Sequence, residues 1–242
     1  MKTGTLYGVG LGSGDPELMT VKAARILRDT KLIAYFSKGG KVGHARSIMA
    51  GYITDAHEEI PLVYPVTTEY PVIDPRYVQL IAGFYEDSAQ LIAGKLLGGE
   101  DVAVPCVGDP FFYGSFMHLY RRLAGKFPCE VVAGVPAMVG CWSAAGVPIT
   151  WGDDVLTVLP ATLPEAELLD RLKQTDAAVI MKLGKGFAKA RRAIEQAGSL
   201  KRATYIEYGT MEKQKILPLA QKTDDKAPYF SMIIIAGNGR QL

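Results

Sequence analysis

The stretch that decides the fold reads Val102-Ala103-Val104-Pro105-Cys106-Val107-Gly108-Asp109-Pro110-Phe111-Phe112-Tyr113-Gly114. Apolar residues of a predicted strand lead into a Gly-Asp-Pro turn, and aromatic residues and a glycine follow before a predicted helix. A lone Gly-Asp-Pro is common in ordinary connections between a strand and a helix. In an open α/β sheet, however, the crevice beyond the carboxyl ends of the strands is where ligands bind. The stretch therefore predicts a strand end beside a ligand if a related turn accompanies it.

Such a turn opens the chain, as Leu6-Tyr7-Gly8-Val9-Gly10-Leu11-Gly12-Ser13-Gly14-Asp15-Pro16. Its alternating glycines permit positive φ and let a ligand approach the backbone without meeting a Cβ atom. The dinucleotide-binding pattern Gly-x-Gly-x-x-Gly fails, because Ser13 or Asp15 stands where the third glycine is required. No Gly-Lys-Ser/Thr follows, which excludes a Walker A loop. We therefore expect a glycine-rich ligand turn of another kind.

The composition is that of an ordinary globular protein, with 48% hydrophobic and 21% charged residues among 242. The net charge of +2 is too small, and the basic residues too scattered, to indicate nucleic-acid binding. Cysteine and histidine lack metal-ligand spacing, so we expect no metal site and free, buried thiols. No signal-peptide pattern and no run long enough for a membrane span is found, so we expect a cytoplasmic protein without membrane contact.

Apolar runs alternate with amphipathic stretches, which favours βαβ units and a mostly parallel sheet. Strands are predicted at residues 5–9, 32–36, 60–63, 102–104, 130–132, 155–159, 177–181, 203–206 and 229–235. Helices are predicted at 20–28, 44–50, 76–97, 116–124, 137–145 and 187–196, and another helix runs to 173 from a capping box at 162–165. The pattern restarts near Gly134. We therefore predict an α/β fold with two α/β lobes, residues 1–134 and 135–242, and a ligand cleft between them.

The combination of these motifs is more specific than its parts. The first turn ends in Asp-Pro, the Gly-Asp-Pro-Phe-Phe-Tyr-Gly loop follows about a hundred residues later, and Val131-Val132-Ala133-Gly134-Val135-Pro136-Ala137 opens the second lobe. In this the chain resembles the tetrapyrrole (precorrin) methylase family over essentially its whole length. Within that family, residues 7–12, 62–69, 108–117 and 179–184 look like the branch that methylates carbon 20 of precorrin-2.

The resemblance implies an S-adenosylmethionine-dependent C-methyltransferase of corrin biosynthesis, with the cofactor folded between two α/β lobes and S-adenosylhomocysteine as a product. It also implies a homodimer and a tetrapyrrole substrate. The chain departs from the family's pattern at Ser13 and Ala133, where proline is frequent. The positions that match the family's cofactor contacts are Ser13, Val107, Gly108, Asp109, Phe112, Pro136, Ala137, Lys182, Leu183 and Gly209. For Asp109, shaping of the loop and direct cofactor contact are both open.

Methyl transfer from a sulfonium to an electron-rich substrate carbon requires no protein nucleophile and no metal, so alignment of the reactants supplies most of the catalysis. A base is still needed if a proton leaves afterwards, and Glu69 and Glu207 are the candidates. Hydroxyl and cationic side chains are expected to bind the substrate's propionate and acetate groups. The residues predicted for this role are Tyr64, Thr67, Thr68, Tyr113, Arg46 and Lys182.

Three alternatives stay open at this stage. Another member of the family would methylate a different ring carbon. A module that binds the cofactor without turnover would keep the glycine turns and show no transfer. A nucleotide-dependent oxidoreductase is disfavoured by the missing dinucleotide pattern. The sequence does not distinguish a cobalt-free from a cobalt-containing substrate.

Overall fold

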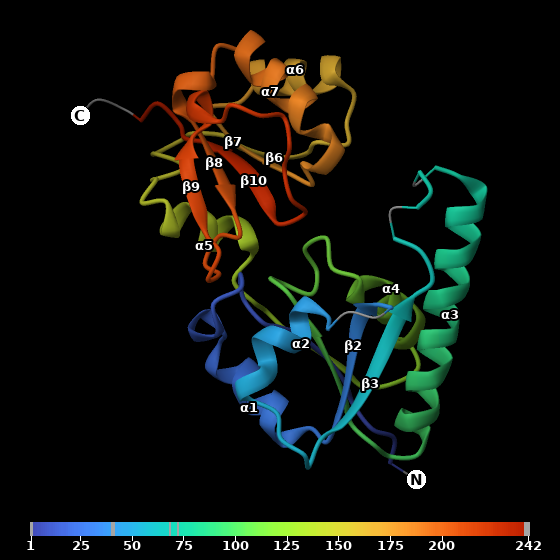
Figure 1. Ribbon diagram of the computed structural model, residues 1–242. Helices are drawn as coiled ribbons and strands as arrows, with labels where there is room; N and C mark the ends of the chain where they lie inside the picture. Colours follow the sequence, from blue (N-terminus) through green and yellow to red (C-terminus); the bar gives the residue numbers. More distant parts are fainter. Residues whose placement is uncertain (1, 40–41, 68, 72, 240–242) are drawn as a thin grey trace. The chain divides into compact units, whose positions relative to one another are not determined.

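The computed structural model describes residues 2–39, 42–67, 69–71 and 73–239 (Figure 1). The chain divides into two compact units, Met1–Pro136 and Ala137–Leu242, and each is described by itself. The boundary predicted after Gly134 lies just before this division. Among the described residues, no helix has the length and apolar character needed to cross a membrane.

The N-terminal unit is built on a five-stranded sheet in the order β3-β2-β4-β1-β5, and every neighbouring pair is parallel. The strands are β1 (Leu6–Gly10), β2 (Leu32–Lys38), β3 (Glu58–Tyr64), β4 (Val102–Cys106) and β5 (Cys129–Val132). The helices are α1 (Val21–Asp29), α2 (His44–Ile48), α3 (Pro75–Leu97) and α4 (Phe116–Leu123). The predicted parallel βαβ organisation is therefore confirmed for this unit.

Helices cover both faces of this sheet (Figure 1). On one face, Leu27 of α1 and Ile48 of α2 pack with Ile33 of β2. On the other face, Ile92 of α3 and Leu119 of α4 pack in a second buried cluster. Strands buried on both sides read as continuous apolar runs, which is why the stretch 102–106 carries no polar residue.

The order of the strands creates a switch point between β1 and β4. These strands are neighbours, yet the chain leaves β1 through α1 on one face of the sheet and leaves β4 through α4 on the other face. At such a point the two loops diverge and open a crevice beyond the carboxyl ends of the strands. The glycine-rich turn follows β1 and the Gly-Asp-Pro loop follows β4, so the fold brings both predicted ligand loops to this point.

The C-terminal unit has a mixed five-stranded sheet in the order β6-β7-β10-β8-β9. The strands are β6 (Leu156–Pro160), β7 (Ala177–Met181), β8 (Ala203–Glu207), β9 (Lys215–Pro218) and β10 (Ser231–Ile235). Helices α6 (Glu165–Lys173) and α7 (Phe187–Gln196) pack on one face, and α5 (Ala137–Ala144) packs on the other.

Three predictions for this unit are wrong. The sheet is not mostly parallel, because β10 enters between β7 and β8 and runs antiparallel to both. The last strand begins at Ser231 rather than Tyr229, and the short edge strand β9 was not predicted. The capping box does not form, because Pro164 occupies the N-cap position and the Glu165 carboxylate instead pairs with Arg192 of α7 at 2.7 Å.

The three cysteines are free thiols. Cys106 and Cys141 are buried, and burial raises the pKa of each to about 12. Cys129 is only partly buried, so the expectation of buried thiols fails at this position.

Candidate cofactor and substrate site

The two glycine-rich loops of the N-terminal unit are joined by backbone hydrogen bonds. Gly108 N–H donates to the Gly12 carbonyl oxygen at 2.6 Å, and Gly12 N–H donates to the Gly108 carbonyl oxygen at 3.4 Å. The Leu11 N–H extends this pairing to the Cys106 carbonyl oxygen at 2.9 Å. Motifs nearly a hundred residues apart in the sequence therefore form one backbone surface at the switch point.

Glycine is required at this surface because the backbones of three strand ends touch. A Cβ atom on Gly134, after β5, would lie 2.1 Å from the Gly108 carbonyl oxygen. A Cβ atom on Gly10 would lie 2.5 Å from the Gly134 Cα atom. Gly12 and Gly108 have φ of +81° and +76°, which side chains rarely adopt. The result is a side-chain-free backbone cradle, the kind of surface that lets a ligand approach closely.

Asp109 shapes the loop after β4. Its Oδ1 accepts a hydrogen bond from Phe111 N–H at 2.8 Å, and its Oδ2 accepts one from Gly134 N–H at 3.0 Å. The first is the local turn that aspartate commonly makes with the backbone two residues on. The second ties the loop to the end of β5. The carboxylate thus holds two strand ends together, which favours the loop-shaping role of the two considered from sequence.

Backbone strain is concentrated in the predicted loops. Among the described residues other than glycine, positive φ is found at Tyr113 (54°), Lys182 (57°), Tyr208 (49°) and Thr210 (63°). Tyr113 belongs to the loop after β4, Lys182 follows β7, and the last two flank Gly209 after β8. Residues held in the left-handed region persist only where the surroundings impose it, and they are frequent at ligand sites. Each of these loops contains residues that the sequence predicts to bind the cofactor or the substrate.

Tyr64, predicted to bind substrate, ends β3 within a cluster of aromatic rings. Its ring stacks on Phe36 with centroids 5.6 Å apart, and its hydroxyl contacts the Ser115 hydroxyl and lies 3.5 Å from that of Tyr85. Ser115 precedes α4, so Tyr64 links the end of β3 to the loop after β4. His118 stacks on Tyr85 at 4.0 Å, and burial together with Arg122 lowers the pKa of its imidazole.

A second cluster lies beside Tyr64 and contains a lysine that was not predicted. Lys38 Nζ lies 2.7 Å from Glu69 Oε1 and 2.8 Å from the Thr67 hydroxyl oxygen. Glu69, a predicted base, is therefore an ion-pair partner, and Thr67 is a neighbour of the same cation. The prediction missed Lys38 because it ended the strand at Phe36, whereas β2 runs to Lys38. Thr68, also predicted to bind substrate, lies outside the described residues.

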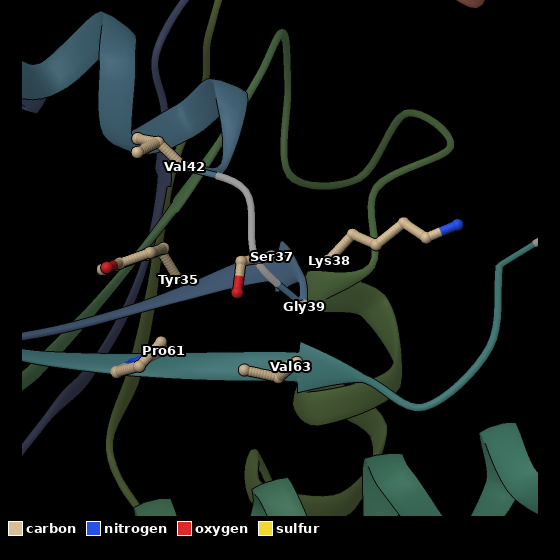
Figure 2. Close-up of a pocket in the computed structure, with 7 residues that line it drawn as sticks. All are labelled: Tyr35, Ser37, Lys38, Gly39, Val42, Pro61 and Val63. Carbon is tan, nitrogen blue, oxygen red and sulfur yellow. The ribbon is translucent and has the colours of Figure 1, made fainter.

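Arg46, predicted to bind a substrate carboxylate, is engaged within the protein. Its Nε lies 2.6 Å from Glu59 Oε2 in a largely covered ion pair. Burial and the neighbouring Glu59 raise the pKa of Tyr35 beside this pair. A shallow pocket of about 360 Å³ lies over the same strip of β2 and β3 (Figure 2). It is lined by Tyr35, Ser37, Lys38, Gly39, Val42, Pro61 and Val63.

In the C-terminal unit, Gly209 packs directly on α5. A Cβ atom at this position would lie 2.3 Å from Cys141 Sγ. The Lys182 residue as a whole is exposed just after β7, although desolvation lowers the pKa of its ammonium group. The Leu183 side chain is fully buried under α6 and α7, so this predicted residue offers only its backbone to a ligand.

Glu207, the other predicted base, is held on a different face from the Gly209 contact. Tyr205 Oη donates to Glu207 Oε1 at 2.8 Å, and Lys215 Nζ lies 3.8 Å from Glu207 Oε2. Tyr205 packs under α6 and α7, whereas Ile206 packs with Cys141 of α5. Side chains alternate along a strand, so Glu207 shares the Tyr205 face.

The remaining predicted residues lie in the same loops. Ser13 is buried within the loop after β1. Val107 and Phe112 are half-buried in the loop after β4, and Pro136 and Ala137 are half-buried where the two units are divided. Within the described part of the chain, no group of three or more histidine, cysteine, aspartate or glutamate side chains is arranged to hold a metal ion.

An all-parallel sheet with glycine loops paired at its switch point, followed by a second α/β unit, belongs to the class of α/β architectures in which ligands bind beyond the carboxyl ends of the strands. Comparison with known proteins makes this specific. The family model of the tetrapyrrole (corrin/porphyrin) methylases matches residues 5–222. The chain belongs to this family.

Curated relatives span the chain from end to end. A precorrin-2 C(20)-methyltransferase from Sinorhizobium is 51% identical over 234 residues, which cover 97% of this chain and 96% of that protein. A cobalt-precorrin-2 C(20)-methyltransferase from Salmonella typhimurium is 29% identical, with 96% of both chains covered. The crystal structure of a cobalt precorrin-4 methyltransferase has a TM-score of 0.72 at 22% identity and covers 96% of this chain and 94% of its own, which shows that the fold is shared.

Proposed function

We propose that this methylase transfers a methyl group from S-adenosylmethionine to carbon 20 of precorrin-2, or of its cobalt-containing counterpart, in corrin biosynthesis. The assignment of the substrate and of the methylated carbon rests on the Sinorhizobium relative, which is 51% identical and is named for that activity. The sequence motifs favour the same branch of the family. They lie at residues 7–12, 62–69, 108–117 and 179–184.

The residues of the switch point fit S-adenosylmethionine. The cradle formed by Gly10, Gly108 and Gly134 offers backbone groups, and a Cβ atom on Gly10 or on Gly134 would meet neighbouring backbone. We propose that the loops after β1 and β4, through Ser13, Val107, Gly108, Asp109 and Phe112, hold the cofactor. We propose further contacts from Pro136, the last residue of the N-terminal unit, and from Ala137, Lys182, Leu183 and Gly209 in the C-terminal unit.

The methyl transfer requires the protein mainly to align the two reactants. When bound, S-adenosylmethionine supplies an electrophilic methyl group on a sulfonium, and a partly reduced tetrapyrrole supplies a nucleophilic carbon. The chain's task is to hold the two reactants in line, which contributes up to about 7–11 kcal/mol in well-oriented reactions. Asp109 serves this task by fixing the loop after β4 to the end of β5.

Glu69 and Glu207 remain the proposed candidates for a base that removes a proton after methylation. Both carboxylates accept hydrogen bonds in the free protein, Glu69 from Lys38 and Glu207 from Tyr205. Replacing Glu207 by glutamine distinguishes the two candidates. If Glu207 is the base, the variant loses most of its kcat and keeps the KM for the tetrapyrrole unchanged.

The test is an anaerobic incubation of the purified protein with methyl-labelled S-adenosylmethionine and precorrin-2, in parallel with and without inserted cobalt. Label in the tetrapyrrole supports the proposal, and the faster of the two substrates identifies the route. Binding of S-adenosylmethionine without transfer to either tetrapyrrole would contradict it and would favour a module without turnover. We also propose, from the family resemblance, a homodimer in the cytoplasm, and sedimentation velocity tests the dimer.

A further inference from the structure

We propose that Lys38 binds a carboxylate of the substrate and that Glu69 occupies the place of that carboxylate in the free protein. This inference rests on the proposed function, because it requires a substrate with a fringe of carboxylates. Of the two cations expected from sequence for this role, Arg46 and Lys182, it replaces Arg46, and it gives Glu69 a task other than proton transfer.

The fold places Lys38 at the edge of the sheet where the ligand loops gather. Lys38 is the last residue of β2, and its partner in the parallel register is Tyr64, the last residue of β3. Residues paired in this way point to the same face of a sheet, so Lys38 shares the face of Tyr64 and Phe36. In Figure 2 the Lys38 side chain extends past the end of β2, away from Tyr35 and Val42.

The contacts of Glu69 form a carboxylate-binding arrangement. Lys38 Nζ donates to Glu69 Oε1 at 2.7 Å, and the Thr67 N–H donates to Glu69 Oε2. The Thr67 hydroxyl lies 3.3 Å from the same Oε2 and 2.8 Å from Lys38 Nζ. An ammonium group, a backbone N–H and a hydroxyl therefore converge on one carboxylate. A propionate or acetate group presents the same two oxygens to these donors.

The exposure of the pair makes exchange with a ligand feasible. The Lys38 and Glu69 side chains are 45% and 46% exposed, whereas Arg46 and Glu59 are 28% and 31% exposed. Ion pairs accessible to solvent contribute little stability, so an incoming carboxylate displaces Glu69 at small cost. Arg46 is less available, because its partner Glu59 also bonds to Tyr35.

The test compares steady-state kinetics of the wild type with Lys38→Met and with a matched control, Lys95→Met. Lys95 is also a partly exposed lysine paired with a glutamate, Glu58, at 3.0 Å, but Glu58 begins β3 at the opposite end of the sheet. We expect Lys38→Met to raise the KM for precorrin-2 about tenfold, since a charge-assisted hydrogen bond is lost. The Kd for S-adenosylmethionine stays unchanged, Lys38→Arg restores part of the KM, and Lys95→Met behaves as the wild type.

Glu69→Gln tests the second half of the inference. It removes the charge that competes for Lys38, so we expect an equal or lower KM for precorrin-2. A hundredfold loss of kcat at unchanged KM would show instead that Glu69 is the base, and would overturn the stand-in role. An unchanged KM in Lys38→Met would overturn the binding role. If Lys38→Met fails to fold, as judged by its thermal melt, Lys38→Gln is measured in its place.

A binding measurement separates this inference from the proposed function. Uroporphyrin III is a carboxylate-rich tetrapyrrole, and its Kd is determined by fluorescence titration for the wild type, Lys38→Met and Lys95→Met. Weaker binding by Lys38→Met alone supports the inference even if the wild type transfers no methyl group to precorrin-2, an outcome that would refute only the proposed function. Equal affinity in all three proteins overturns the inference whatever the enzyme methylates.

Discussion

Asp109 uses both carboxylate oxygens as acceptors of backbone N–H groups, and no neutral side chain of its shape does the same. In Asp109→Asn, one of the two positions becomes an NH₂ group that faces an N–H donor. We expect a loss of about 1–3 kcal/mol in the free energy of unfolding, the usual cost of leaving a partly buried donor unpaired. The affinity for S-adenosylmethionine falls with it. Urea unfolding and calorimetric titration measure the two effects.

The matched control for this prediction is Asp101→Asn. Asp101 accepts from the Thr5 N–H with Oδ1 at 2.6 Å, and the amide oxygen of asparagine can keep that bond. A control variant as unstable as Asp109→Asn would show that the loss reflects general charge removal rather than the two bonds of Asp109.

Gly209 was predicted from the family resemblance to contact the cofactor, and the structure gives it a packing reason of its own. In Gly209→Ala the new methyl group collides with Cys141 Sγ, and overpacking of this kind costs about 1–3 kcal/mol. In the double variant with Cys141→Ala the sulfur is gone, and the remaining neighbours of the new methyl group are Ile206 Cγ2 at 3.2 Å and the residue 141 Cβ at 3.5 Å. Thermal melts should therefore show recovery of stability in the double variant. If the double variant regains thermal stability but not affinity for S-adenosylmethionine, Gly209 has a binding role as well. If it regains no stability, the packing explanation is refuted.

At the scale of elements, two threonines precede helices and only one caps its helix. Thr20 Oγ1 accepts from Ala23 N–H at 3.1 Å at the start of α1, whereas Thr162 makes no cap bond to α6, which begins after Pro164. We expect Thr20→Ala to lower the free energy of unfolding by about 1 kcal/mol and Thr162→Ala to change it by less than about 0.5 kcal/mol. Equal losses in chemical denaturation would contradict the caps seen in the structure.

The elements of the N-terminal unit could be predicted because periodicity and turn residues agree there. In the C-terminal unit the apolar run 231–235 predicts a buried strand but carries no information about direction, which depends on where the chain returns to the sheet. The strand β9 has only four residues at the sheet edge, between Lys215 and Pro218, and so short a run gives no clear alternation.

The candidate site was predictable where it depends on backbone geometry and much less where it depends on side-chain partners. Glycine and Asp-Pro turns identify strand ends from local sequence alone, and β1 and β4 do end beside these turns, at Gly10 and Cys106 rather than at the predicted Val9 and Val104. Glu59, the partner of Arg46, comes from β3, and the sequence gives no signal that joins the two. Tyr205, the partner of Glu207, is only two residues away on β8, so this contact could have been anticipated from the alternation of side chains along a strand. Lys38 was missed for a local reason, since the predicted strand ended two residues too early.

At the scale of the whole molecule, each unit has its own buried clusters on both faces of its own sheet. The sequence pattern that restarts near Gly134 reflects this organisation. The first unit presents paired glycine loops at its switch point, and the second presents left-handed residues at Lys182, Tyr208 and Thr210. The family model of the tetrapyrrole methylases matches residues of both units.

The central claim is the position of the methyl group, and NMR of the labelled product measures it most directly. The wild-type protein is incubated anaerobically with precorrin-2 and S-adenosylmethionine carrying a ¹³C-methyl group, and the product is compared with a reaction that lacks protein. We predict that the label is found at carbon 20. Label at any other ring carbon would leave the family intact and contradict the proposed reaction.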